Sequence, residues 1–281
     1  MALLEIENLT YSYPATGEPA LRDLSLHIEA GEFVAVIGLN NAGKTTLCHA
    51  LTGVIPHLYN GRMEGRVAIR GVDSRELCVA DIALDVGLVM QTPTSQFSGV
   101  RFTVFEEVAF GLENRGVARE GMRERVEAAL VLAGVADLAD RSPLHLSGGQ
   151  QQKVALASVM ACGPSVLVLD EPTTFLDPQG TRQVFETLHD LREDGTTVVI
   201  AEHRLEWIAR YADRVCLLDG GRLVLDGPPA EILCHPLLPE VGLDWNRFTK
   251  VAGFAEAQGM WQCGQPLATT FSQIVNGLKV K

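Results

Sequence analysis

Long apolar segments are missing from this 281-residue sequence. No apolar run approaches the roughly 20 residues that a membrane-spanning helix needs. Residues 1–7 also lack the basic segment and the long apolar core of a signal peptide. If the protein works at a membrane, we therefore expect separate partner subunits to cross the bilayer.

Positive charge and patterned cysteine are scarce as well. The net charge at pH 7 is −12 and the isoelectric point is about 5.0, which argues against a general nucleic-acid-binding protein and leaves room only for a local basic patch. The six cysteines form no C-x-x-C pair and have no histidine spacing typical of zinc, and several lie in apolar runs, where cysteine is usually a small core residue. We expect no disulfides and a reducing cytoplasm. The cysteines are Cys48, Cys78, Cys162, Cys216, Cys234 and Cys263.

The residues that are present predict an α/β protein with one large domain or two small ones, and 47% of them are hydrophobic. Segments 4–7 and 24–29 alternate apolar and polar residues, which is typical of half-exposed, antiparallel strands. Short apolar runs later in the chain predict the buried strands of a mostly parallel sheet. Segment 65–71 alternates like another half-exposed strand. The other strands predicted after residue 30 are 33–37, 85–91, 166–169, 196–201, 214–218 and 222–225.

Helical patterns dominate residues 92–163. Thr103 is placed to cap a helix over 104–111, with Glu106 completing a capping box. Helical spacing continues over 119–133 and from Ser147 to Cys162, so we predict a helical subdomain inserted between strands. Further helices are predicted over 178–192 and 205–211. Beyond residue 235 the pattern thins, and residues 236–281 are expected to form a peripheral extension.

Residues Gly38–Thr46 match the pattern G-x-x-x-x-G-K-[ST] between a predicted strand and a predicted helix. That context distinguishes a phosphate-binding P-loop from an ordinary glycine-rich turn. Backbone N–H groups and the positive end of the helix would converge on phosphates. Lys44 would reach the β- and γ-phosphates, and the Thr45 hydroxyl would bind Mg²⁺.

Two carboxylates, Asp170 and Glu171, follow a buried strand, at the edge of the sheet where open α/β proteins bind ligands. Asp170 would hold Mg²⁺ through water, and Glu171 would polarise the water that attacks the γ-phosphate. Carboxylates at a strand end are also often merely structural. Ser147, Gly148 and Gly149 begin another helix as a second anion-binding nest, which makes sense if two copies cooperate.

The pentapeptide Leu146–Gln150 resembles the signature of the nucleotide-binding domain of ATP-binding cassette (ABC) proteins. The resemblance covers about residues 3–235, and the motifs occur in the family's order. It implies a P-loop NTPase of ABC type, with a mostly parallel core sheet, an antiparallel β subdomain and an inserted helical subdomain at about 92–163. The expected division is a nucleotide-binding domain over 1–235 and a C-terminal extension over 236–281.

The same resemblance implies roles for individual residues. Tyr13 would stack on adenine, with Tyr11 as the competing candidate and loop packing as the alternative for both. Gln91 would touch Mg²⁺ or the attacking water, His203 would contact the γ-phosphate, and Asp177 belongs to a loop that reaches the partner subunit. Catalysis would rest on Lys44, Gln91, Glu171 and His203, and Mg²⁺ would be held by Thr45, Gln91 and Asp170. The residues expected to bind ATP are Tyr13, Gly38, Asn40, Asn41, Gly43, Lys44, Thr45 and Thr46, with Ser147, Gly148, Gly149 and Gln150.

A narrower resemblance is to the ATPase subunits of energy-coupling-factor (ECF) importers. It rests on segments 55–57, 86–93, 96–97, 104–114 and 201–205. Such importers take up vitamins and some transition-metal ions through separate substrate-binding membrane subunits. The resemblance also implies that a C-terminal extension supports pairing of the ATPases.

Three residues depart from the family's usual pattern. Asn41 stands where glycine is common, and asparagine is the least costly replacement if the backbone there has positive φ. Lys153 replaces a usual arginine, and Phe175 occupies a position where a small residue is frequent. None of these changes removes a catalytic group, but the last two could alter contacts across a dimer.

These features predict an ATPase subunit on the cytoplasmic face of a membrane. Its expected partners are a second ABC ATPase, identical or paralogous, a transmembrane coupling subunit and a substrate-binding membrane subunit, with no nucleic acid. One alternative is an ABC ATPase that acts on nucleic acid or the ribosome, but such proteins typically carry two cassettes or a coiled-coil insertion. The other is a regulatory subunit without turnover, which the intact Asp170–Glu171 pair disfavours.

Overall fold

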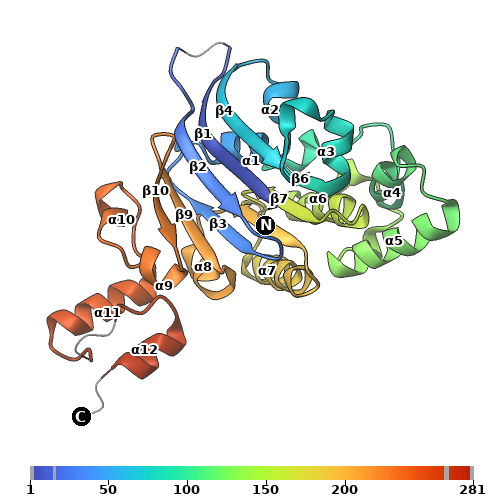
Figure 1. The fold of residues 1–281 in the computed structure, drawn as a ribbon. Coiled ribbons are helices and arrows are strands. Elements are labelled where there is room, and N and C mark those ends of the chain that lie inside the picture. Colours follow the sequence, from blue (N-terminus) through green and yellow to red (C-terminus); the bar gives the residue numbers. More distant parts are fainter. Residues whose placement is uncertain (1–2, 15–16, 263–265, 279–281) are drawn as a thin grey trace.

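The computed structural model describes residues 3–14, 17–262 and 266–278 (Figure 1). A six-stranded sheet with the order β10-β9-β3-β8-β7-β6 forms the centre. Its first five strands in sequence are parallel, and β10 pairs antiparallel to β9. Every residue of β3, β7 and β8 is buried, which explains their continuous apolar sequences. The strands are β3 (Phe33–Ile37), β6 (Val86–Val89), β7 (Val166–Asp170), β8 (Thr197–Ala201), β9 (Arg214–Asp219) and β10 (Arg222–Gly227).

A second, antiparallel sheet has the order β2-β1-β4-β5. Its strands are β1 (Leu4–Ser12), β2 (Leu21–Ile28), β4 (Arg62–Ile69) and β5 (Val72–Asp73). The alternating residues predicted to form half-exposed strands do so, because β2 buries every second or third side chain. The buried side chains of this sheet share one hydrophobic cluster with helix α1 (Lys44–Leu51) and one face of the central sheet.

The opposite face of the central sheet is covered by α7 (Pro178–Glu193), α8 (Leu205–Tyr211) and α9 (Pro229–Ile232). Phe185 of α7 lies at the centre of this second cluster and stacks on Trp207 and Tyr211 of α8. Both faces of the parallel sheet are therefore covered, as the alternation of strands and helices predicts.

Helices α4 (Val104–Asn114), α5 (Arg119–Leu132) and α6 (Gly148–Ala161) form a third cluster, on the right of Figure 1. The predicted capping box is confirmed, because Thr103 accepts a hydrogen bond from the Glu106 N–H and Glu106 accepts one from the Thr103 N–H. Helix α3 (Val79–Asp85) was not predicted. It includes Asp85, the first residue of the strand predicted over 85–91, so that β6 begins at Val86. Helix α2 (Val54–His57) was missed too.

The C-terminal residues carry more structure than their thin pattern indicates. They form α10 (Leu237–Glu240), α11 (Arg247–Ala257) and α12 (Phe271–Gly277), and the last two share a small cluster around Trp261 and Ile274. Asn246 and Thr270 cap α11 and α12. Figure 1 shows this segment projecting from the α8–α9 side, away from the helical cluster.

Some predictions fall outside the described residues, namely those on residues 1–2 of the N-terminal segment and on Cys263. Of the described cysteines, Cys48 and Cys216 are buried core residues as expected, whereas Cys78 is exposed. Among the described residues, no helix combines the length and apolar character needed to cross a bilayer.

Candidate nucleotide site and signature turn

The P-loop connects β3 to α1 and is packed against two other backbone segments. A Cβ atom on Gly38 would lie 2.5 Å from the Leu218 carbonyl oxygen, and one on Gly43 would lie 2.8 Å from that of Ala20. Only glycine fits at these two positions. Asn41 has a φ of 66°, so this departure from the family pattern falls where asparagine is the least costly alternative to glycine, as predicted.

Lys44, the first residue of α1, has a nearly buried side chain that is 5% exposed. Its Nζ donates hydrogen bonds to the carbonyl oxygens of Gly38 at 3.0 Å and Leu39 at 3.1 Å, and lies 3.6 Å from Glu171 Oε1. The P-loop backbone therefore holds the ammonium group over the loop, between the glycine turn and the carboxylate.

Glu171 lies directly after β7 and is the meeting point of the predicted catalytic residues. Gln91 Nε2 donates to Glu171 Oε2 at 2.8 Å, and His203 Nε2 lies 2.8 Å from Glu171 Oε1. Gln91 follows β6 and His203 follows β8, so adjacent parallel strands bring both to the carboxyl edge of the sheet. Glu171 has a φ of 49°, an uncommon conformation for a non-glycine residue that is typical of functional sites.

Asp170, the last residue of β7, is 4% exposed, and its Oδ1 has no hydrogen-bond partner. Burial raises the pKa of this carboxyl above its usual range, and a hydrogen bond with Thr45 opposes the shift. An unpartnered buried carboxylate oxygen beside a threonine hydroxyl suits a hard cation such as Mg²⁺. The described residues hold no group of three His, Cys, Asp or Glu side chains able to form a complete metal cage.

A cavity of about 560 Å³ opens above these groups. It is lined by seven of the residues predicted to bind ATP, together with Gln91 and Glu171; the seven are Tyr13, Asn40, Asn41, Gly43, Lys44, Thr45 and Thr46. The structure separates the two tyrosine candidates. Tyr13 lines the cavity with its hydroxyl 3.2 Å from Thr46 Oγ1, whereas Tyr11 is fully buried and donates to the Tyr59 carbonyl oxygen.

The signature residues form a separate turn at the start of α6, in which Ser147 and Gly148 are exposed, and they are absent from the described lining of the P-loop cavity. Ser147 accepts from the Gln150 N–H at 3.4 Å, and Gln150 Oε1 accepts from the Ser147 N–H at 3.0 Å. The side chain of Gln150, predicted to bind ATP, is thus part of a capping box. The S-x-x-Q spacing could have revealed this cap.

Three further residues singled out in the sequence make contacts in this region. Asp177 caps α7 by accepting a hydrogen bond from the Gly180 N–H, a role that the resemblance does not imply. Lys153 donates to Gln183 Oε1 at 2.7 Å and so ties α6 to α7. Phe175 is 49% exposed and packs beside Gly148.

Four polar residues that position the site were missed. Gln96 accepts from the Met90 N–H and donates to the Ala155 carbonyl oxygen, and Gln152 donates to the Met90 carbonyl oxygen. Together they fasten the strand end that carries Gln91 to α6. Glu202 and Arg204, on either side of His203, bind residues 173–181. A charged residue directly after the fully apolar strand β8 was the available signal.

Comparison with known proteins places this geometry in a family. The model of the ABC transporter family matches residues 21–174. A putative ABC transporter ATP-binding protein of Pyrococcus abyssi is 43% identical over 233 residues, which cover 83% of this chain and 82% of the relative. A putative ABC transporter ATP-binding protein of Streptomyces avermitilis is also 43% identical, but this chain covers only 43% of its length.

Solved structures agree. The cbiO1 protein of Clostridium perfringens, described as part of the ABC transporter complex cbiONQ, superposes with a TM-score of 0.73, at 30% identity over 91% of this chain and 99% of that one. The dimeric ATP-binding cassette MJ0796, in a post-hydrolysis state with ADP and Pi, gives a TM-score of 0.72, at 28% identity over 80% of this chain and 98% of that one. The α/β fold, the P-loop with its carboxylates and these relatives together show that the chain belongs to the ATP-binding subunits of ABC transporters, which are ATPases.

Proposed function

We propose that this chain is the ATP-hydrolysing subunit of an ECF-type membrane importer for a vitamin or a transition-metal ion. One observation carries the hydrolytic part: Glu171 is held by Gln91 at 2.8 Å and His203 at 2.8 Å, with Lys44 at 3.6 Å. The likeness to cbiO1 over 91% of the chain and the ECF-like segments support the importer class.

In the proposed reaction, ATP is bound between the P-loop of one subunit and the signature turn of a second. Tyr13 stacks on the adenine, and the P-loop backbone with Lys44 holds the phosphates. Ser147 and Gly149 of the opposite subunit complete the site at the γ-phosphate. In the capping box Ser147 Oγ only accepts a hydrogen bond, so its O–H can still donate to the γ-phosphate, alongside the first N–H groups of α6.

Glu171 polarises the attacking water, while Lys44 and His203 stabilise charge on the transferring phosphoryl group. Gln91 orients the water by its bond to Glu171. Asp170, Thr45 and Gln91 are the residues that would hold Mg²⁺. A bound Mg²⁺ supplies positive charge that offsets the negative charge developing on the phosphate oxygens.

The proposed partners follow from the same arrangement. A second ABC ATPase, identical or paralogous, is needed to complete each site, and residues 236–281 support this pairing. A transmembrane coupling subunit contacts the surface near Gln91, and a membrane subunit binds the transported solute. The chain would lie peripherally at the cytoplasmic face of the membrane.

Substitution of Glu171 by Gln tests the hydrolytic assignment. Loss of the base should lower steady-state phosphate release by about 100- to 10,000-fold. The variant should still form ATP-dependent dimers, measurable by size-exclusion chromatography with light scattering. The matched control is Glu186→Gln, which changes an exposed carboxylate on α7 and should leave phosphate release at the wild-type rate. Undiminished phosphate release by Glu171→Gln would disprove the assignment.

Co-purification tests the importer class. The chain is co-expressed with an ECF coupling subunit and a substrate-binding membrane subunit, and the complex is isolated in detergent through a tag on the coupling subunit. We expect recovery of this chain in stoichiometric amount and ATPase activity that depends on the complex. An ATPase subunit of an unrelated ABC importer is the negative control. If both are recovered equally poorly, the ECF proposal fails while the ATPase assignment stands.

A further inference from the structure

Two charged residues on either side of His203 bind the same short segment of chain. Glu202 is 3% exposed, and its Oε1 accepts from the backbone N–H groups of His203 at 2.7 Å and Arg204 at 3.2 Å. Its other oxygen accepts from the hydroxyl of Thr173, which is fully buried. Glu202 therefore fixes the backbone turn that aims the His203 side chain.

Arg204 binds the other side of that segment. Its Nη2 donates to the carbonyl oxygens of Thr173 and Leu176, both at 3.1 Å, and its Nη1 donates to Thr181 Oγ1 at 2.6 Å. A guanidinium group has a rigid fork of donors, so one side chain holds several acceptors in a fixed relation. We call residues 172–177 the bridging loop, because this loop starts beside Glu171 and ends at the cap of α7.

The far side of the bridging loop lies against the signature turn. A Cβ atom on Gly149 would lie 3.0 Å from the Phe175 carbonyl oxygen and 3.3 Å from Leu176 Cδ2. One on Gly148 would lie 3.5 Å from the Phe175 ring. Gly149 lets the backbone of the loop approach the first turn of α6 closely, so displacement of the loop would displace the signature.

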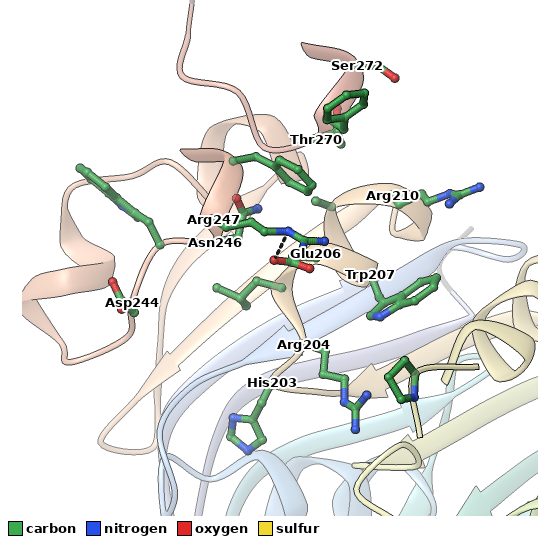
Figure 2. A pocket seen from close by; sticks show the side chains of 16 residues that line it. His203, Arg204, Glu206, Trp207, Arg210, Asp244, Asn246, Arg247, Thr270 and Ser272 are labelled. Carbon is green, nitrogen blue, oxygen red and sulfur yellow. Dashed lines mark ion pairs between the residues drawn. The ribbon is translucent and has the colours of Figure 1, made fainter. Parts of the chain in front are cut away.

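A cavity lies on the side of Arg204 that faces away from the bridging loop. It measures about 1120 Å³ and lies between α8 and the C-terminal helices α11 and α12 (Figure 2). In Figure 2, His203 and Arg204 lie at its inner end, while Glu206 and Arg247 point toward each other across it and form an ion pair of 2.9 Å. With open space on that side, the position of Arg204 depends mainly on its bonds to the bridging loop and α7.

We propose that Glu202 and Arg204 are positioning residues that set His203 and the signature turn by means of one element, the bridging loop. His203 serves the nucleotide bound by its own P-loop, whereas the signature serves the nucleotide of the opposite subunit. We call these two residues, Glu202 and Arg204, the clamp. Through them the two ATP sites of a dimer are linked by contacts inside one chain. This inference rests on the proposed function, because it requires the signature to act across the dimer.

The test compares substitutions of two arginines that line the same cavity. Arg204→Ala should lower kcat about tenfold, since small misplacements of catalytic groups cost one to two orders of magnitude. The affinity of a single chain for a fluorescent ATP analogue should change by less than about twofold, because the P-loop is untouched. Arg204→Lys should recover part of kcat. Arg210→Ala, which removes an exposed arginine of α8 six residues after Arg204, is the control and should retain wild-type kcat.

A double-mutant cycle separates positioning from general weakening of the fold. Phe175→Ala removes the contact between the bridging loop and Gly148 and should lower kcat by itself. The double variant Arg204→Ala/Phe175→Ala should be no slower than the slower single variant. Both substitutions disturb the same series of contacts, from Arg204 through the bridging loop to the signature turn. If Arg204→Ala gives no folded chain, the cycle is run with Arg204→Lys.

The proposal is overturned if Arg204→Ala keeps wild-type kcat. It is also overturned if the decreases in kcat caused by Arg204→Ala and by Phe175→Ala multiply in the double variant. Failure of the proposed function would look different. Turnover that survives Glu171→Gln contradicts the hydrolytic assignment, whereas turnover lost in Glu171→Gln but kept in Arg204→Ala contradicts only the link between the sites.

Discussion

The P-loop and the signature turn each lead into a helix, but the surrounding structure fixes the two in different ways. Around the P-loop, Lys44 and Asp170 are 5% and 4% exposed, and Glu171 is contacted from three separate elements. In the signature turn Ser147 and Gly148 are exposed, and the serine and glutamine satisfy each other's backbone groups. One region depends on the interior of the sheet, and the other on a local capping box and the neighbouring bridging loop.

This difference has an energetic consequence. Asp170 Oδ1 is buried without a partner, and such groups cost the fold free energy until a ligand satisfies them. The site around the P-loop is thus organised in advance for charge, which is how electrostatic catalysis avoids reorganisation during the reaction. Around the signature turn, Ser147 and Gln150 leave no buried side-chain atom without a hydrogen-bond partner among the described residues.

Lys44→Ala gives the largest expected effect and tests whether the P-loop region alone binds ATP. Loss of a cation at the transferring phosphoryl group should lower kcat by about 1000-fold. Binding of a fluorescent ATP analogue by dilute, monomeric chain should be lost with it. Ser147→Ala should instead leave monomer binding intact and impair only turnover. Equal loss of monomer binding in both variants would remove the distinction between the two regions.

Gly149→Ala tests the close approach of the signature turn to the bridging loop. A Cβ atom there would lie 3.0 Å from a carbonyl oxygen, a contact that requires backbone movement. We expect kcat to fall about tenfold from misplacement of the signature, with ATP binding by the monomer unchanged. Gly121→Ala on α5, where an added Cβ would meet nothing within 4 Å, is the control and should keep wild-type kcat. Equal rates for the two variants would show that the packing of the turn is unimportant.

Asn41 offers a smaller test, confined to stability. Its φ of 66° costs an alanine about 1–2 kcal/mol, and asparagine less. Asn41→Ala should therefore lower the free energy of unfolding by about 1 kcal/mol, whereas Asn41→Gly should change it by less. Urea denaturation at pH 7 measures both. Asn40→Ala, at the neighbouring exposed position without positive φ, should stay within about 0.5 kcal/mol of the wild type.

Much of this comparison could be predicted from sequence, because short apolar runs and motifs are local signals. The fully apolar runs gave β3, β7 and β8, and the parallel arrangement then brought Gln91, Glu171 and His203 to one edge. The sequence favours Tyr13 over Tyr11 only through the resemblance, since alternation along β1 does not say which face the cavity occupies. In the structure Tyr11 is completely buried and Tyr13 lines the cavity, so stacking of Tyr13 on adenine stays the prediction.

The clamp on the bridging loop could not be predicted, because its contacts depend on tertiary structure. Arg204 binds carbonyl oxygens about 30 residues away in sequence, and no periodic pattern encodes such a contact. The C-terminal helices were missed for another reason. Their cluster is built largely from alanines around Trp261, which gives a weak apolar period.

The smallest expected effect concerns pH and a histidine of the P-loop helix. His49 faces the buried side of α1 with its Nδ1 unpartnered, and burial lowers the pKa of its imidazole below the ordinary 6.5. The unfolded chain therefore binds a proton more readily than the folded one. Stability is full above pH 6.5 and is lost as the pH falls toward the lowered pKa.

Replacement of His49 by Gln should make the free energy of unfolding less dependent on pH between 7.5 and 5, by roughly 1 kcal/mol or less. Urea denaturation at several pH values measures the slope. His145, exposed just before the signature turn, is the matched control, and His145→Gln should change stability by less than about 0.5 kcal/mol at each pH. An unchanged slope in His49→Gln would show that acid sensitivity arises elsewhere. A shallower slope would place it in the buried P-loop region, where interior contacts hold the helix, and not at the exposed turn.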